Sequence, residues 1–124
     1  MAGRRVLAVV FWVVVIAAPV AAALVAVAQF PAGAEIPLHW NAQNQIDDWG
    51  SPWTMVPVSA IMSGANLLLA LMYRFSDALY NMGLVHGVSR RATRPFLCGT
   101  AVFLDVLLVG ILIYWVLKAL PYVG

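Results

Sequence analysis

Three long stretches of apolar residues dominate the chain. They cover about residues 6–30, 55–73 and 96–117. Each is long enough to cross a membrane, since a helix needs roughly 20 residues to span about 30 Å of hydrocarbon. Backbone groups inside a bilayer must find partners within their own segment, so each stretch is predicted to be an α-helix. The pattern predicts an all-α integral membrane protein, a bundle of three transmembrane helices in one polytopic domain over residues 1–124.

Two polar connections join these stretches. Residues 31–54, predicted to form an ordered loop, carry three acidic residues and no lysine or arginine. Six of the seven basic residues lie before the first stretch or in the second connection, residues 74–95. Because basic residues stay on the cytoplasmic side of membrane proteins, the N-terminus and the second connection are predicted to be cytoplasmic. The first connection and the C-terminus are then extracytoplasmic.

The composition excludes a soluble domain and changes how the charge is interpreted. Hydrophobic residues make up 64% of the chain and charged residues 10%, far from the balance of a soluble protein. The sequence pI near 9.0 reflects basic residues gathered on one side of the membrane. This indicates attraction to anionic headgroups and no binding of nucleic acid, so the lipid bilayer is the first expected partner.

The first stretch has an alternative interpretation as a cleavable signal peptide. Arg4 and Arg5 precede it, and Ala26-Val27-Ala28 resembles a cleavage site. Its apolar run exceeds the 7–15 residues of a signal peptide core, which favours a retained helix. Pro19 lies inside this helix and is predicted to kink it, while a neighbouring helix satisfies the carbonyl group that the proline leaves unpaired.

Two polar residues interrupt the other stretches. Asp105 lies near the middle of the third, where an ionised carboxylate is costly. At a helical rise of 1.5 Å per residue, the depth of Asn66 in the membrane differs from that of Asp105 by only about 3 Å. A hydrogen bond between the two side chains is therefore predicted. The alternative is a proton or ion site. The absence of a second titratable group in the sequence nearby favours an interhelical clamp.

The remaining chemistry is concentrated in the first connection. Asparagines there tolerate positive φ, prolines stiffen the ends, and the tryptophans are expected to pack together or lie at the lipid surface. The imidazole of His39 is expected to hydrogen-bond a loop carboxylate or carbonyl group. The predicted ordered cluster consists of His39, Trp40, Asn41, Asp47 and Trp49, and the predicted binding surface adds Asp48.

Metal binding and hydrolysis are less well supported by this connection. Zinc needs three or four converging ligands, and the loop offers one histidine with scattered carboxylates. Ser51 and His39 have no third group to orient them, as nucleophilic catalysis requires. We therefore expect no catalytic residue, no metal and no other cofactor.

The loop resembles a bacterial membrane-protein family, domain of unknown function 1648. The family's hallmark is an outer loop after the first helix, which this chain matches in order at Pro37, His39, Trp40, Asn41, Asp47, Trp49, Gly50 and Ser51. The family's glycine falls at Asn44, and asparagine is the residue that best replaces glycine in a left-handed turn. The resemblance covers about residues 1–75.

The same domain occurs in immunity proteins against sporulation-delaying toxins, which also sequester a repressor at the membrane. This chain is shorter and lacks their second conserved half in its third stretch. The resemblance implies this fold segment and a place in the bacterial cytoplasmic membrane, and it only suggests a function. Of two possible classes, we favour a non-enzymatic integral membrane protein whose outer loop binds a membrane protein, peptide or lipid headgroup. An immunity, sensor or accessory-subunit role would follow.

The alternative function is a subunit of a small transporter or channel that uses Asp105 and Asn66. It requires a homo-oligomer, because three helices are too few to enclose a pore.

Overall fold

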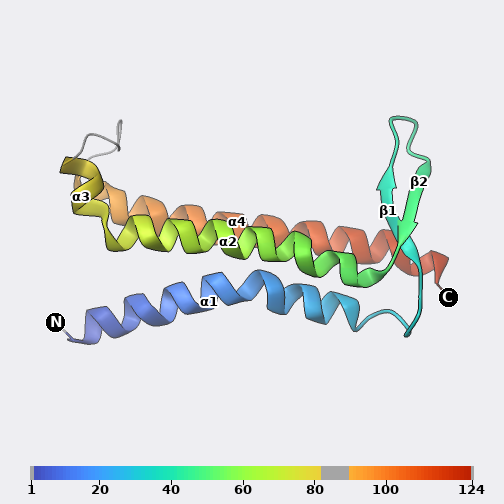
Figure 1. Cartoon of the computed structure of the whole chain (residues 1–124), viewed down its shortest axis with the longest axis horizontal. Helices are drawn as coiled ribbons and strands as arrows, with labels where there is room; N and C mark the ends of the chain where they lie inside the picture. The colour runs from blue at the N-terminus through green and yellow to red at the C-terminus, as the bar shows by residue number, and fades with distance from the viewer. Residues whose placement is uncertain (1, 82–89, 124) are drawn as a thin grey trace.

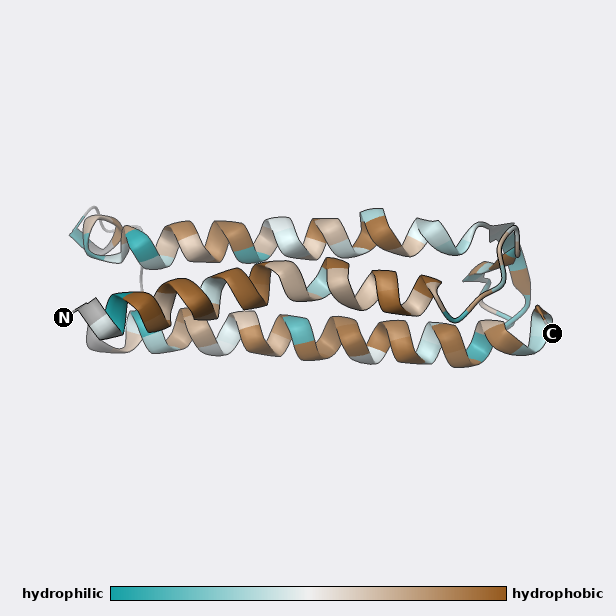
Figure 2. Cartoon of the chain, turned by 90° about the horizontal axis from the view of Figure 1, so that it is seen from below, coloured by the Kyte–Doolittle hydropathy of each residue, from teal (hydrophilic) through white to brown (hydrophobic). Residues whose placement is uncertain are grey.

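The structure is a computed structural model that describes residues 2–81 and 90–123. Three long helices, α1 (Ala2–Val27), α2 (Met55–Arg74) and α4 (Arg90–Ala119), lie side by side in an elongated bundle (Figure 1). All three are long and apolar enough to cross a membrane. Apolar residues cover most of their length (Figure 2), and many large apolar side chains face outwards, including Leu7, Ile61 and Val106. The predicted bundle of three transmembrane helices is confirmed.

Several helix boundaries differ from the prediction, and α1 begins at Ala2 instead of residue 6. α1 ends at Val27, before the expected residue 30, because Pro31 disfavours helical backbone at Phe30. α4 starts at Arg90 and not at residue 96, and Pro95 lies inside it. A short helix, α3 (Ser76–Asn81), directly follows α2. The connection expected at 74–95 is therefore partly helical at both ends.

The first connection contains secondary structure that the sequence analysis did not predict. Strands β1 (Ile36–Trp40) and β2 (Ile46–Gly50) form an antiparallel hairpin. The hairpin projects from the end of the bundle that also holds the C-terminus (Figure 1). A 3-10 helix, η1 (Pro52–Thr54), leads into α2, and the Ser51 Oγ caps it by accepting a hydrogen bond from the Trp53 amide at 3.2 Å.

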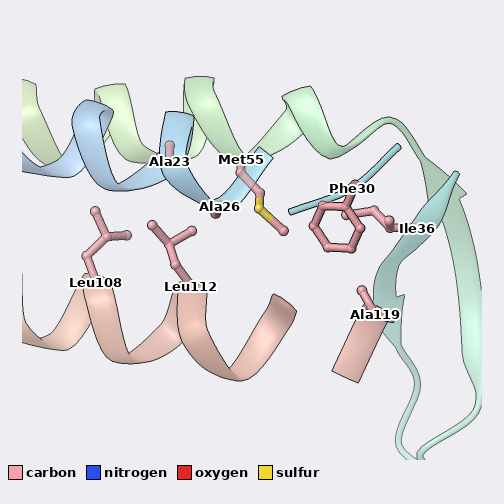
Figure 3. Close-up of a cluster of buried hydrophobic side chains, with 8 residues drawn as sticks. All are labelled: Ala23, Ala26, Phe30, Ile36, Met55, Leu108, Leu112 and Ala119. Atoms are coloured by element: carbon pink, nitrogen blue, oxygen red, sulfur yellow. The ribbon is translucent and has the colours of Figure 1, made fainter. Parts of the chain in front are cut away.

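Two apolar clusters hold the helices together. The cluster nearer the hairpin joins α1, α2, β1 and α4 (Figure 3) and contains Ala23, Ala26, Phe30, Ile36, Met55, Leu108, Leu112 and Ala119. The second cluster, towards the other end, contains Trp12, Val15, Leu97 and Ala101. Because Ile36 and Met55 are fully buried, the base of the hairpin is part of the same core as the helices.

Candidate functional site

The base of the hairpin is fixed to the C-terminal end of α4. The indole Nε1 of Trp115 donates a hydrogen bond to the Pro37 carbonyl oxygen at 2.8 Å. Trp49 on β2 packs edge-on against Tyr122, with ring centroids 5.6 Å apart. Tyr122 closes η2 (Leu120–Tyr122), the 3-10 helix that follows α4. These contacts hold the hairpin in one orientation on the bundle.

The tip of the hairpin is organised by Asn41. Its side-chain Oδ1 accepts hydrogen bonds from the backbone amides of Gln43 at 3.0 Å and Gln45 at 2.9 Å. Asn44 has a φ of 59°, the left-handed conformation expected where the family has glycine. Asn41 is thus a turn-forming residue whose polar atoms are already engaged inside the loop.

His39 and Asp47 form a polar pair on the surface of the hairpin. The His39 Nδ1 lies 2.7 Å from the Asp47 Oδ1, which confirms the predicted hydrogen bond to a loop carboxylate. The side chains are 67% and 42% exposed. In sheet register His39 faces Asp48, but the register is irregular on both sides of His39, and its ring meets Asp47. An exposed pair of this kind contributes at most about 1 kcal/mol to the free energy of folding. Stabilisation of the fold therefore does not explain why the pair lies on the surface of the hairpin.

The tryptophans were expected either to pack together or to lie at the lipid surface, and they do not form a single group. Trp49 packs on Tyr122, and Trp53 is largely exposed. Trp40 lies half-buried opposite Ile46 across the sheet. Among the aromatic pairs of the described residues, none joins two of these three tryptophans. They therefore do not pack on one another, and the alternative, that they lie at the lipid surface, stays a prediction.

Two open hollows flank the base of the hairpin. One, of about 490 Å³, lies between the end of α1 and η1 and includes Trp53. The other, of about 420 Å³, includes Trp49 and Tyr122. Both share the turn that contains Glu35. Tyr122 and Trp115 also belong to this surface, although no sequence pattern indicates it, because they are distant in sequence and only the fold brings them here.

The structure offers no group of ligands that matches a metal site in its described parts. No three or more His, Cys, Asp or Glu side chains come together within residues 2–81 and 90–123. His39 and Asp47 supply two potential ligands, fewer than the three or four that zinc requires.

A second polar site lies inside the bundle and joins all three long helices. The Asn66 Nδ2 donates to the Asp105 Oδ1 at 2.6 Å, which confirms the predicted interhelical bond. The same Nδ2 donates to the Val15 carbonyl oxygen at 2.9 Å. Val15 lies four residues before Pro19, which has no N–H to offer that carbonyl. Asn66 therefore supplies the missing hydrogen bond, as expected of a neighbouring helix.

The clamp leaves some buried polar atoms without partners. The Asn66 Oδ1 has none in the described part of the chain, and the same holds for the hydroxyl oxygens of Ser59 and Ser63. The three residues follow each other at positions i, i+4 and i+7, so they share one face of α2. This face is buried at Ser59 and Asn66.

Comparison with known proteins finds one family model that matches the central part of the chain. Residues 14–62 match the family model described as Domain of unknown function (DUF1648). The matched segment runs from the middle of α1 through the hairpin into α2, a shorter range than the resemblance suggested. It includes Pro19 and the His39–Asp47 pair, whereas Asn66 and Asp105 lie beyond it. No curated protein and no solved structure matches the chain.

Proposed function

We propose, from the premise that residues 14–62 belong to the DUF1648 family, that this chain is a non-enzymatic membrane protein whose hairpin binds a basic peptide or protein segment. An immunity, sensor or accessory-subunit role would use such a surface. The observation that carries the proposal is the exposed His39–Asp47 pair beside Asp48, presented on a hairpin that the bundle holds in place.

Preorganisation supports binding at this hairpin. Its base shares the apolar core through Ile36, and Trp115 anchors it by a hydrogen bond to Pro37. The Asn41 side chain fixes the turn at its tip. A surface that is already ordered loses less conformational entropy when a partner binds, so more of the contact energy remains as affinity.

The charge of the hairpin region favours a cationic partner. Residues 31–54 contain Glu35, Asp47 and Asp48 and no lysine or arginine. A negative surface repels lipid phosphate groups but complements lysine and arginine side chains of a peptide. Trp49 and Trp53, in the same region, are exposed rings of the type that anchors protein interfaces. We therefore favour a peptide or protein over a lipid headgroup as the occupant.

The proposed location is the bacterial cytoplasmic membrane, with the hairpin and the C-terminus outside the cell and the N-terminus inside. Arg4, Arg5, Arg74 and Arg94 lie at the end of the bundle away from the hairpin. This asymmetry supports the orientation, since basic residues are retained on the cytoplasmic side.

A second candidate function is a transporter or channel subunit. The observation that favours it is the row of unpartnered oxygens of Ser59, Ser63 and Asn66 on one face of α2, which ends at the Asn66–Asp105 hydrogen bond. Polar groups at this depth often line ion or proton paths. The engagement of the Asn66 amide in two hydrogen bonds supports the clamp instead. A proton path requires Asp105 to titrate, so Asp105→Asn should abolish transport if this candidate is right.

Affinity capture from native membranes in mild detergent tests the binding function. We expect the tagged chain to retain a stoichiometric partner, and the Asp47→Asn/Asp48→Asn variant to lose it. Salt should weaken the binding of the partner, because the attraction is between exposed charges. Gln43→Ala is the matched control, since the turn uses the backbone amide of Gln43. Equal capture by the double variant and the parent chain would contradict the proposed binding face.

A further inference from the structure

A groove of about 830 Å³ lies between α1 and α2 at the end of the bundle opposite the hairpin, with Arg94 of α4 at its edge. The N-terminal half of α1 diverges from α2 in two perpendicular views (Figures 1 and 2). The Asn66–Val15 hydrogen bond holds the two helices together farther along, at the middle of the bundle. The groove is therefore open at the end of the bundle and closes towards its centre.

Four arginines line the open end of the groove: Arg4, Arg5, Arg74 and Arg94. Within the described residues, none of them forms an ion pair with a carboxylate. Arg94 is held in place, with its guanidinium carbon 5.1 Å from the centre of the Tyr73 ring. Its Nε also donates to the Tyr73 carbonyl oxygen at 3.4 Å. The groove thus presents concentrated positive charge that the described part of the chain does not neutralise.

The deeper part of the groove is apolar and has the length of one membrane leaflet. Trp12, Ile16 and Ala70 are among its walls. From Arg5 to Ile16 the groove follows α1 for about 17 Å at 1.5 Å per residue. Half of a hydrocarbon core of about 30 Å is roughly 15 Å. An occupant with a charged end among the arginines and an apolar body of this length fits both parts.

We infer that this groove binds one anionic phospholipid, with its phosphate among the four arginines and an acyl chain along α1. Basic pockets between transmembrane helices are suited to anionic headgroups. A free phosphate ion makes no use of the apolar walls. A second copy of this chain would bring its own arginines against these four and meet like-charge repulsion.

Native mass spectrometry of the full chain tests the site. The chain is reconstituted with equal amounts of phosphatidylglycerol and phosphatidylcholine that carry identical acyl chains, and is then released from detergent micelles. We expect one phosphatidylglycerol to be retained per chain. Each arginine near a headgroup contributes about fivefold to affinity, so Arg74→Gln/Arg94→Gln should weaken retention roughly 25-fold. Lys118→Gln, at the opposite end of the bundle, is the matched control and should have no effect.

A second variant separates a fitted site from diffuse attraction. Ala8 is half-buried in the wall of the groove, and Ala8→Phe fills the apolar part without changing charge. We expect it to lose the bound lipid while circular dichroism shows an unchanged helical content. The fluorescence of Trp12 gives an independent signal, because Trp12 lines the groove and the other four tryptophans lie at the hairpin end. Phosphatidylglycerol with brominated chains should quench the fluorescence of Trp12. Ala8→Phe should reduce that quenching.

Four results would overturn the inference. Equal retention of the two lipids, or retention unchanged by Arg74→Gln/Arg94→Gln, would show that the arginines do not select the headgroup. Retention unchanged in Ala8→Phe would show that the apolar groove is not used. A lipid-free dimer that Ala8→Phe converts to a monomer would show that a second copy of the chain covers the groove.

Discussion

Replacing Asn66 by leucine removes the side chain that joins all three long helices. The change abolishes hydrogen bonds of 2.6 Å to Asp105 and 2.9 Å to the Val15 carbonyl oxygen. Leucine has a similar volume, so the effect does not come from a cavity. Hydrogen bonds within membranes average about 0.6 kcal/mol and reach about 1.7 kcal/mol. With two lost at once, we expect the free energy of unfolding to fall by about 1–3 kcal/mol.

Pro19 allows this prediction to be tested more sharply. Pro19→Ala restores an N–H that can pair with the Val15 carbonyl inside α1, so that carbonyl no longer depends on Asn66. Asn66→Leu should then cost about 0.6–1.5 kcal/mol less in the Pro19→Ala background than in the parent chain. The two residues should therefore be energetically coupled although they lie on different helices.

A double-mutant cycle measured by steric trapping in bicelles supplies the assay. The control cycle pairs Pro19→Ala with Ser59→Ala, because the Ser59 hydroxyl has no hydrogen-bond partner in the described residues. That control cycle should be additive within about 0.5 kcal/mol. The reasoning is refuted if the Pro19–Asn66 cycle is also additive, since Asn66 would then not be compensating for the proline.

Other substitutions and a fusion test separate stability, local order, binding and topology. Asp105→Asn keeps an acceptor for Asn66 and should change the unfolding free energy by less than about 0.5 kcal/mol, whereas Asp105→Leu should cost about 1 kcal/mol in the same assay. A stable Asp105→Asn chain without biological activity would instead favour transport. Asn41→Ala removes the acceptor of two backbone amides and should speed hydrogen exchange at the hairpin tip, and unchanged exchange would count against the turn assignment. His39→Ala breaks an exposed bond, so it should change stability by no more than about 1 kcal/mol and yet weaken partner capture. A reporter fused after Ser51 should be active outside the cytoplasm, and cytoplasmic activity would reverse the proposed orientation.

Some features of the fold could be predicted because they depend on length and depth alone. The apolar stretches are long enough to define three spans without further information. The Asn66–Asp105 bond followed from counting residues along two neighbouring helices, because helical rise fixes depth. The missing N–H of Pro19 indicated an unpaired carbonyl, although the sequence did not show which side chain would reach it.

The hairpin was harder to predict because its strands are short and depend on distant residues. Ile36 and Leu38 alternate with Pro37 over only a few positions, which is a weak strand signal. The contact between Trp115 and Pro37 spans 78 residues, and no local pattern indicates such a pairing. The third stretch was predicted to begin at residue 96, but α4 begins at Arg90 and contains Pro95, so the boundary was placed too late.

Photo-crosslinking from the hairpin tip tests the proposed binding function most directly. A photoreactive amino acid at Ala42, an exposed position in the turn, leaves both Asp47 and Asp48 in place. In native membranes it should give one discrete protein or peptide adduct, which Asp47→Asn/Asp48→Asn abolishes and high salt reduces. Adducts with lipid alone, or a protein adduct of equal yield in the double variant, would contradict the binding of a basic partner by the acidic residues of the hairpin.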